Sequence, residues 1–209
     1  MRIPVAPEGW PFVFPPAAAA CILSVMGWWA AAIVFGVVAL AFLGFFRDPE
    51  RVAPTDAGAV LSPADGKVMA ISPVEDAWVG PAVRVSVFLS PLDVHVNRAP
   101  VDGLVRSVEY ASGKFHAAYR AEASEVNERC TVALEAPAAR VAVRQIAGVL
   151  ARRIVCRVKS GDRLRAGDRY GLIRFGSRTD LVLPRRALVR VRVGDRVRGG
   201  ESIVGILEG

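Results

Sequence analysis

The dipeptide Gly176-Ser177 offers the most unusual chemistry in this sequence of 209 residues. It follows the apolar run Gly171–Phe175, which has the composition of a strand. Glycine leaves its carbonyl open to attack and tolerates strained dihedral angles. The Ser177 hydroxyl could therefore attack the Gly176 carbonyl and turn the amide into an ester. Elimination and hydrolysis would then leave a ketone, a pyruvoyl group, at a new N-terminus. Gly-Ser is also a common turn dipeptide, so its surroundings must decide.

Three further segments carry side chains suited to acid–base chemistry or to phosphate binding. They are Leu61–Val68 with Asp65, Phe88–Pro100 with His95, and Gly113–Tyr119 with Lys114 and His116. Each also has a plain structural interpretation, because Asp-Gly forms turns and a histidine within an apolar alternation often packs in a core. A basic loop that begins with glycine can meet a phosphate, although this signal is weak by itself.

Strand patterns dominate the chain after residue 50. Val83–Leu89 and Val189–Val193 alternate with a period of two. Further strand candidates are Leu104–Tyr110, Thr131–Leu134, Arg140–Ile146, Ile154–Val158 and Gly171–Phe175. Ala117–Ala123 is a short helix candidate, and Val149–Arg153 is ambiguous. The sequence therefore predicts a mainly β domain of barrel or sandwich type.

One internal repeat is visible within this domain. Val158–Asp168 matches Val191–Glu201 at a constant offset of 33 residues. Each copy reads as a strand, a Gly-Asp turn, a short basic strand and a glycine turn, which predicts two related hairpins. The same unit occurs in lipoyl- and biotinyl-type domains, so we expect lipoyl-like hairpins. Those domains present a lysine at a hairpin tip, whereas Phe175-Gly-Ser177 stands between the copies here.

The first 46 residues predict a membrane anchor, ahead of a soluble domain at 47–209. Trp10–Phe46 has no charged residue over 37 positions, and about 20 apolar residues cross a bilayer as a helix. Prolines at 11, 15 and 16 are expected to break the first part of this run. Either a single tilted span near Gly27–Phe46 or a helical hairpin with its turn near Met26-Gly27 fits the pattern.

Positive residues flank the apolar run on both sides, with Arg2 before it and Arg47 and Arg51 after it. By the positive-inside rule this favours a hairpin with both ends in the cytoplasm. The sequence thus predicts an inner-membrane protein whose β domain lies on the cytoplasmic side.

The net charge of +7 belongs essentially to the β domain. Residues 140–198 hold 16 Arg and one Lys against four Asp, a net charge of +13. Beside a membrane anchor this excess favours an anionic lipid surface as partner, although a merely solvated arginine-rich surface is the alternative. Few aromatic residues are available to stack bases, which argues against nucleic acid. The three cysteines, at 21, 130 and 156, have no metal-binding spacing and are expected to be reduced thiols.

Taken together, the four segments resemble the phosphatidylserine decarboxylase proenzymes, in the short form with an N-terminal membrane segment. The likeness runs from Phe45–Pro49 to the C-terminus and is carried by Ser62–Lys67, Ser90–His95, Gly113–Phe115 and Arg174–Arg178. The resemblance implies self-cleavage between Gly176 and Ser177. The products would be a β chain of residues 1–176 and an α chain of residues 177–209, which stay associated through strand pairing.

The resemblance also implies the chemistry and its residues. Ser177 would become the pyruvoyl cofactor, which forms a Schiff base with the amine of phosphatidylserine and accepts electrons as CO2 leaves, giving phosphatidylethanolamine. Asp65 would be the maturation base or would orient it. His95 would act in decarboxylation. The substrate-binding candidates are Arg178, Lys114, His116 and Arg98. No metal is expected.

This chain departs from the family pattern at two positions. Many members have His-x-x-His where this chain has His95 and Arg98, and arginine stays charged and cannot act as a base. Either Asp65 works with His95 alone, or His116 takes the second role. Arg178 stands where longer relatives tend to have threonine. It would lie beside the pyruvoyl group and bind the substrate carboxylate or phosphate, or be a surface charge at the start of a strand.

Two other functions fit parts of the pattern. A non-enzymatic, membrane-anchored lipoyl-like domain that binds anionic lipid or a protein partner would explain the anchor, the charge and the repeat. A pyruvoyl enzyme that acts on another lipid with a serine headgroup would use the same chemistry. We expect a homo-oligomer of unspecified size. The number of membrane crossings and the acyl-chain preference stay open.

Overall fold

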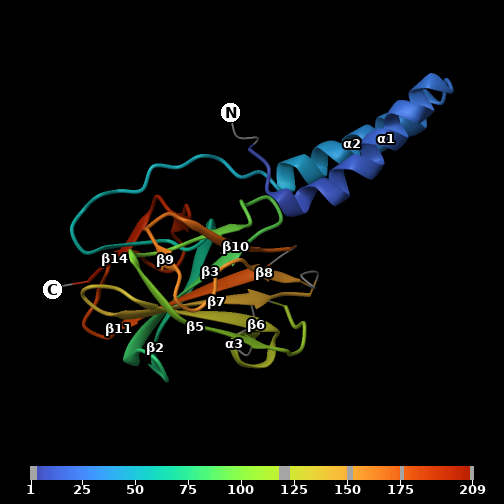
Figure 1. Cartoon of the computed structure of the whole chain (residues 1–209). Coiled ribbons are helices and arrows are strands. Elements are labelled where there is room, and N and C mark those ends of the chain that lie inside the picture. The colour runs from blue at the N-terminus through green and yellow to red at the C-terminus, as the bar shows by residue number, and fades with distance from the viewer. Residues whose placement is uncertain (1–3, 118–122, 150–152, 175–176, 208–209) are drawn as a thin grey trace. The chain divides into compact units, whose positions relative to one another are not determined.

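The computed structural model describes residues 4–117, 123–149, 153–174 and 177–207. The chain forms two compact units, Met1–Glu50 and Arg51–Gly209. The first unit is helical and the second consists mainly of strands (Figure 1).

The N-terminal unit is a helical hairpin. A short 3-10 helix, Pro7–Gly9, leads into α1 (Trp10–Val25), and α2 (Trp29–Phe45) returns beside it. Gly27 lies between the helices with φ +80°, a conformation that glycine adopts without steric cost. Of the two arrangements expected from the sequence, the structure therefore has the hairpin.

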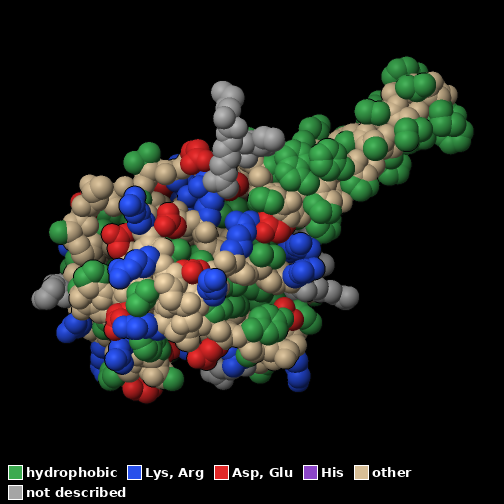
Figure 2. All heavy atoms as spheres, viewed as in Figure 1, with side chains coloured by type: hydrophobic (Ala, Val, Ile, Leu, Met, Phe, Trp, Pro, Cys, Tyr) green, Lys and Arg blue, Asp and Glu red, His purple; other side chains and the backbone are tan. Residues whose placement is uncertain are grey.

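The expectation that prolines break the first helix is wrong for Pro15 and Pro16, which lie inside α1. Proline removes one backbone hydrogen bond but has a helical φ. Packing against α2 supports the helix, with the Phe12 ring 5.7 Å from that of Phe42. By length and composition, Pro7–Val25 is long and apolar enough to cross a membrane, whereas α2 has 17 residues. Apolar side chains cover much of the visible surface of this unit (Figure 2).

In its described residues, the second unit contains three antiparallel sheets. The large sheet has the strand order β13-β2-β3-β11-β7-β6-β5-β9, and two three-stranded sheets have the orders β4-β10-β8 and β1-β14-β12. The strands are β1 (Ala59–Leu61), β2 (Gly66–Asp76), β3 (Gly80–Leu89), β4 (Val96–Arg98), β5 (Gly103–Ala111), β6 (Arg129–Glu135), β7 (Arg140–Ala147), β8 (Ile154–Cys156), β9 (Arg163–Leu164), β10 (Arg169–Ile173), β11 (Ser177–Pro184), β12 (Leu188–Val189), β13 (Arg196–Val197) and β14 (Ile203–Ile206). The large sheet curls into a half-barrel (Figure 1), so the prediction of a mainly β fold is confirmed.

The period-two alternation is explained by a core on one face of the large sheet. Leu181 and Leu183 of β11 are fully buried there, with Val143 of β7 and Val85 and Val87 of β3. Successive side chains of a strand point to opposite faces. Ser177 and Thr179 therefore share the core face with Leu181, and Arg178 and Asp180 lie on the other face.

A second repeat becomes visible beside the first. Pro63–Val68 and Pro100–Val105 have the related sequences Pro-Ala-Asp-Gly-Lys-Val and Pro-Val-Asp-Gly-Leu-Val. The two repeat copies offset by 33 residues pair with these segments at equivalent positions, since Arg196 lies opposite Lys67 and Arg163 lies opposite Leu104. The prediction that each copy forms a lipoyl-like hairpin is therefore wrong, because β9 and β13 pair with β5 and β2 and not with a strand of their own copy. The β unit is thus built partly from two related halves, each made of segments distant in sequence.

Several boundaries differ from the sequence prediction. Of the expected strand Val189–Val193, only Val189 belongs to a strand, β12, although Val189 and Val191 both pack partly against the core. A four-residue helix, α3 (Ala123–Val126), follows the expected helix, whose residues 118–122 lie outside the described part of the chain. Residues 150–152 of the ambiguous segment also lie outside it.

Candidate active site

Ser177 begins the central strand β11 and is fully buried. It pairs with Leu89 of β3 on one side and with Ala147 of β7 on the other. Within the described residues, its Oγ has no hydrogen-bond partner. Phe175 and Gly176 lie outside the described part of the chain, so the Gly176 half of the predicted cleavage site is not described.

Burial of this hydroxyl without a hydrogen bond to a described residue carries a free-energy cost. A buried polar group without a partner costs about 1–3 kcal/mol, so such groups are rare and often functional. Because no described residue occupies its lone pairs or its proton, Ser177 Oγ is available as a nucleophile.

A buried amide network fastens the small β4-β10-β8 sheet to the core face of the large sheet. Asn97 Nδ2 donates to Thr179 Oγ1 at 3.2 Å, and Gln145 Nε2 donates to Asn97 Oδ1 at 2.8 Å. Gln145 Nε2 also lies 3.4 Å from the Val155 carbonyl of β8. All three side chains of the network are fully buried, so it holds β4 at a defined place over β11. Sequence reasoning missed Asn97, whose only signal was its position two residues after His95.

His95 lies immediately before β4 and is 2% exposed. Its Nδ1 is 2.9 Å from the Asp93 carbonyl, so in the neutral ring Nδ1 is assigned as the donor and Nε2 as the basic nitrogen. Asn97 follows His95 by two positions, and Thr179 follows Ser177 by two positions. The Ile173 N–H donates to the His95 carbonyl at 3.3 Å, so His95 is joined to a residue four positions before Ser177.

Asp65 lies in the loop before β2, and its carboxylate binds two groups. Arg51 approaches both carboxylate oxygens, at 2.5 and 2.8 Å, and the backbone N–H of Gly199 donates at 2.8 Å. Strand β3 separates β2 from β11, which places Asp65 roughly 10 Å from Ser177 across the sheet. Asp65 does not hydrogen-bond Ser177 here, and its role in maturation stays a prediction.

Both predicted arginines are 2% exposed. Arg98 Nη1 donates to the Gly167 carbonyl at 3.0 Å. Arg178 Nε donates to Asp180 at 2.6 Å, and its Nη2 donates to Ser86 Oγ at 2.7 Å. The interpretation of Arg178 as a surface charge is therefore wrong, and its side chain lies on the face of β11 opposite to Ser177. Substrate binding by these two arginines stays a prediction.

Lys114 and His116 lie in the loop after β5, which Asn127 fastens beside the strand of Ser177. Asn127 Oδ1 accepts from the His116 N–H at 3.0 Å, while Nδ2 donates to the His116 carbonyl at 2.8 Å and to the Ala147 carbonyl at 2.7 Å. Since Ala147 pairs with Ser177, this loop lies at the same end of the sheet as Ser177.

The thiols of Cys130 and Cys156 interact with each other in the β unit. A hydrogen bond from Cys130 lowers the pKa of Cys156 to about 7, and burial partly opposes this effect. The same hydrogen bond and burial raise the pKa of Cys130. Nearby, burial raises the pKa of Tyr170 well above its ordinary value.

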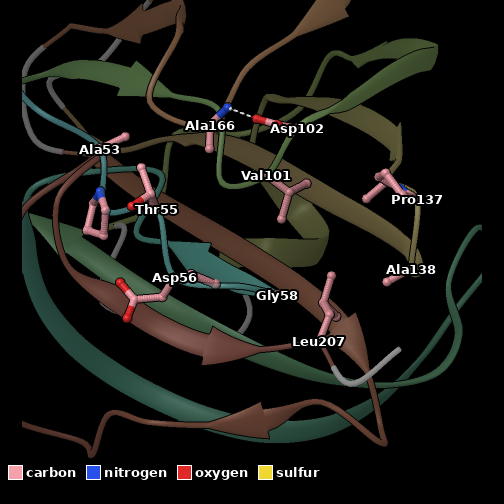
Figure 3. A pocket seen from close by; sticks show the side chains of 13 residues that line it. Ala53, Thr55, Asp56, Gly58, Val101, Asp102, Pro137, Ala138, Ala166 and Leu207 are labelled. Carbon is pink, nitrogen blue, oxygen red and sulfur yellow. Dashed lines mark hydrogen bonds between the residues drawn. The ribbon is translucent and has the colours of Figure 1, made fainter.

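A cavity of about 470 Å³ opens elsewhere on the β unit (Figure 3). It is lined by Val101, Asp102, Pro137 and Leu207, among others, and Ala166 N–H donates to Asp102 there at 2.7 Å. Pro137 lies in the turn between β6 and β7, whereas Ser177 lies at the other end of these strands. The seven residues of β6 span roughly 20 Å, so this cavity is remote from Ser177.

Comparisons with known proteins identify the relatives of this chain. A family model described as phosphatidylserine decarboxylase matches residues 38–205. A phosphatidylserine decarboxylase proenzyme of Geobacter sulfurreducens is 42% identical over 98% of this chain and 97% of its own length. Proenzymes of the same name are 50% identical in Symbiobacterium thermophilum, covering 88% of this chain and 86% of the relative, and 45% identical in Oleidesulfovibrio alaskensis, covering 86% and 83%.

Proposed function

The chain belongs to the phosphatidylserine decarboxylase family, and we propose that it converts phosphatidylserine to phosphatidylethanolamine and CO2 with a pyruvoyl group made from its own Ser177. Family membership makes it a decarboxylase, which excludes the purely non-enzymatic interpretation of its sequence. The observation that carries the pyruvoyl proposal is the fully buried Ser177 hydroxyl, which has no partner among the described residues.

Self-cleavage needs only the chain itself and water. Ser177 Oγ attacks the Gly176 carbonyl carbon, the hydroxyl proton passes to the Ser177 nitrogen, the C–N bond breaks, and an ester replaces the amide. Loss of the α-proton of Ser177 then expels the Gly176 carboxylate and leaves a dehydroalanine at the new N-terminus. Its enamine tautomerises to an imine, and water hydrolyses the imine to the ketone with release of ammonia. The curated relatives are named proenzymes, which agrees with processing of a precursor.

The pyruvoyl carbonyl supplies an electrophile that condenses with the substrate amine and draws electrons from the bond to the departing carboxylate. The side chains of the protein would position the substrate beside this carbonyl and transfer protons to and from it. His95 has a ring held by the Asp93 carbonyl, so its Nε2 can hold or return a proton at the substrate α-carbon. We assign Asp65 to activating Ser177 during maturation, which requires its carboxylate to leave the contacts with Arg51 and Gly199 or to act through water.

The position of β11 supports lasting association of the two products. All eight residues of β11 pair with β3, and six of them also pair with β7. Conversion of Ser177 to the pyruvoyl group would remove only the N–H of that residue and would leave the other hydrogen bonds and the buried face of the strand in place. The fragment 177–209 would therefore remain in the sheet.

We place the enzyme at the inner membrane with its β unit on the cytoplasmic side. The N-terminal hairpin, the basic residues on both flanks of it and the charge of segment 140–198 support this placement. Anionic phospholipid is the expected surface partner. Association into a homo-oligomer also stays a proposal.

Denaturing mass spectrometry of the purified full-length protein tests the proposal. Wild type should give two fragments, residues 1–176 and a blocked fragment of 33 residues. Ser177→Ala should remain a single chain and be inactive. Borohydride added with phosphatidylserine should leave an adduct on the short fragment. A wild-type chain that stays intact at 22.4 kDa while turning over substrate would overturn the pyruvoyl mechanism.

A further inference from the structure

The strands around Ser177 end together at one edge of the large sheet. The strands β3, β11, β7, β6 and β5 have their terminal residues here, and the pairing registers align these residues to within one position. In the same order they are Leu89, Ser177, Ala147, Arg129 and Ala111. Neighbouring strands are about 4.8 Å apart, so the edge is roughly 19 Å wide. We refer to it as the Ser177 end.

Exposed apolar side chains gather on the segments that adjoin this end. Leu92 is 84% exposed, Val149 56%, Phe115 37% and Val126 36%. They stand two to four residues beyond the strand ends, and these four residues form what we call the apolar rim. In the part of this unit that the structure describes, the other exposed large apolar side chains are Val52, Tyr110, Leu188 and Val193, of which Tyr110 also lies at the Ser177 end.

Backbone contacts link the segments of Phe115, Val126 and Val149, and Leu92 follows β3, which pairs with the strand of Ser177. Lys114 N–H donates to the Val126 carbonyl at 2.8 Å, which places Phe115 beside Val126. The Ala147 N–H donates to the Glu128 carbonyl at 3.0 Å, which ties the chain near Val149 to the same group. Apolar side chains are visible over the region of β6 and α3 in Figure 2, with Lys and Arg side chains nearby.

Basic residues also lie on segments near this end. Lys114 precedes Phe115, Arg153 precedes β8, and Arg174 follows β10 and stands three residues before Ser177. Arg153 and Lys114 are exposed. Single apolar side chains separated by long basic ones are typical of surfaces that enter the headgroup region of an anionic bilayer, because the basic stems lie along the acyl chains while their charges reach the phosphates.

We infer that the apolar rim, with Lys114, Arg153 and Arg174, docks the Ser177 end into the surface of an anionic phospholipid bilayer. This inference rests on the proposed function, because a phospholipid must bring its headgroup to a fully buried residue while its acyl chains stay in lipid. It goes beyond the N-terminal anchor, since it specifies which end of the β unit meets the bilayer.

Full-length variants test the docking surface. Leu92→Asp/Val149→Asp places two carboxylates in the rim, and Leu188→Asp is the matched control, because Leu188 is 43% exposed and follows the far end of β11. The substrates are phosphatidylserine in anionic vesicles and dihexanoyl-phosphatidylserine below its micelle concentration. We expect the rim variant to raise KM for vesicles about tenfold and to leave kcat, and turnover of the short-chain lipid, near the wild-type values. The control should match wild type on both substrates.

Hydrogen exchange gives a readout that does not depend on activity. In nanodiscs with anionic lipid, amides of residues 90–93 and 113–116 should exchange more slowly in wild type than in the rim variant, and those of 186–189 should not differ. Wild type inactive on both substrates would contradict the proposed function, and the exchange data would still decide the surface. The docking surface would be overturned if the rim variant left both the KM for vesicles and the exchange rates unchanged. Equal losses of activity on both substrates, or a loss confined to Leu188→Asp, would also overturn it.

Discussion

Asp65 and Asp102 make the same hydrogen bond in two related halves of the β unit. Asp65 Oδ1 accepts from the Gly199 N–H at 2.8 Å, and Asp102 Oδ1 accepts from the Ala166 N–H at 2.7 Å. Gly199 and Ala166 are equivalent in one repeat, and the two aspartates are equivalent in the other. Only Asp65 also binds Arg51. The backbone bond thus belongs to the architecture, and any catalytic role of Asp65 must come from its other surroundings.

This equivalence provides an internal control for the role of Asp65. Asn keeps the oxygen that accepts the backbone bond but cannot act as a base. We expect Asp65→Asn to slow self-cleavage by about a hundredfold or more, and Asp102→Asn to cleave at the wild-type rate, as followed by mass spectrometry after cell-free synthesis. Asp102→Ala should lose about 1–2 kcal/mol of unfolding free energy, and Asp65→Ala should lose more, because it also removes the contact with Arg51. Normal cleavage of Asp65→Asn would remove Asp65 from maturation.

The two histidines should separate maturation from turnover. His95 is buried beside the amide network, and His116 is held in a loop by backbone bonds to Asn127. We expect His95→Ala to lower kcat by about 10²- to 10⁴-fold in whatever protein is cleaved.

Cleavage of the same variants decides between the two options for the second base. If Asp65 works with His95 alone, His95→Ala also slows cleavage and His116→Ala does not. If His116 takes that role, His116→Ala stays uncut. Near-normal turnover by cleaved His95→Ala would exclude His95 from the reaction.

The ion pair of Arg178 and Asp180 should act mainly on stability. Both side chains are at most 2% exposed, and Ser124 Oγ also donates to Asp180 at 2.8 Å. Arg178→Met leaves a buried carboxylate without its main partner and should cost about 3–5 kcal/mol in denaturant unfolding. The double variant Arg178→Met/Asp180→Leu should recover much of that loss. A stable Arg178→Met protein with a raised KM would instead assign Arg178 to substrate binding.

Cys156 should react with iodoacetamide near neutral pH. Its pKa is lowered to about 7, chiefly by the hydrogen bond from Cys130, so its thiolate fraction and alkylation rate should rise as the pH increases through about 7. In Cys130→Ala that bond is gone and burial remains, so the rate profile should move to higher pH. Peptide mass spectrometry in a Cys21→Ser background measures both rates. Identical profiles with and without Cys130 would contradict the assigned cause.

Local sequence patterns were sufficient for several parts of this protein. The alternation in Val83–Leu89 predicted a strand with one core face, and the Gly-Asp repeat revealed two related segments, although neither forms the predicted hairpin. The uncharged run Trp10–Phe46 predicted the apolar helices, because hydrophobic periodicity and length are local properties. The segment around Ser177, with Asp65 and His95 in matching contexts, identified the family.

The tertiary structure decided what depends on pairing between distant segments. Pro15 and Pro16 remain in a helix because α2 packs beside it, which the proline positions alone do not reveal. Arg178 is buried because its partner Asp180 is itself buried on the same face of β11. The position of β4 over β11 depends on contacts of Asn97 with residues 82 and 48 positions away. A sequence lists such side chains one by one, and only closure of the sheets determines which of them meet.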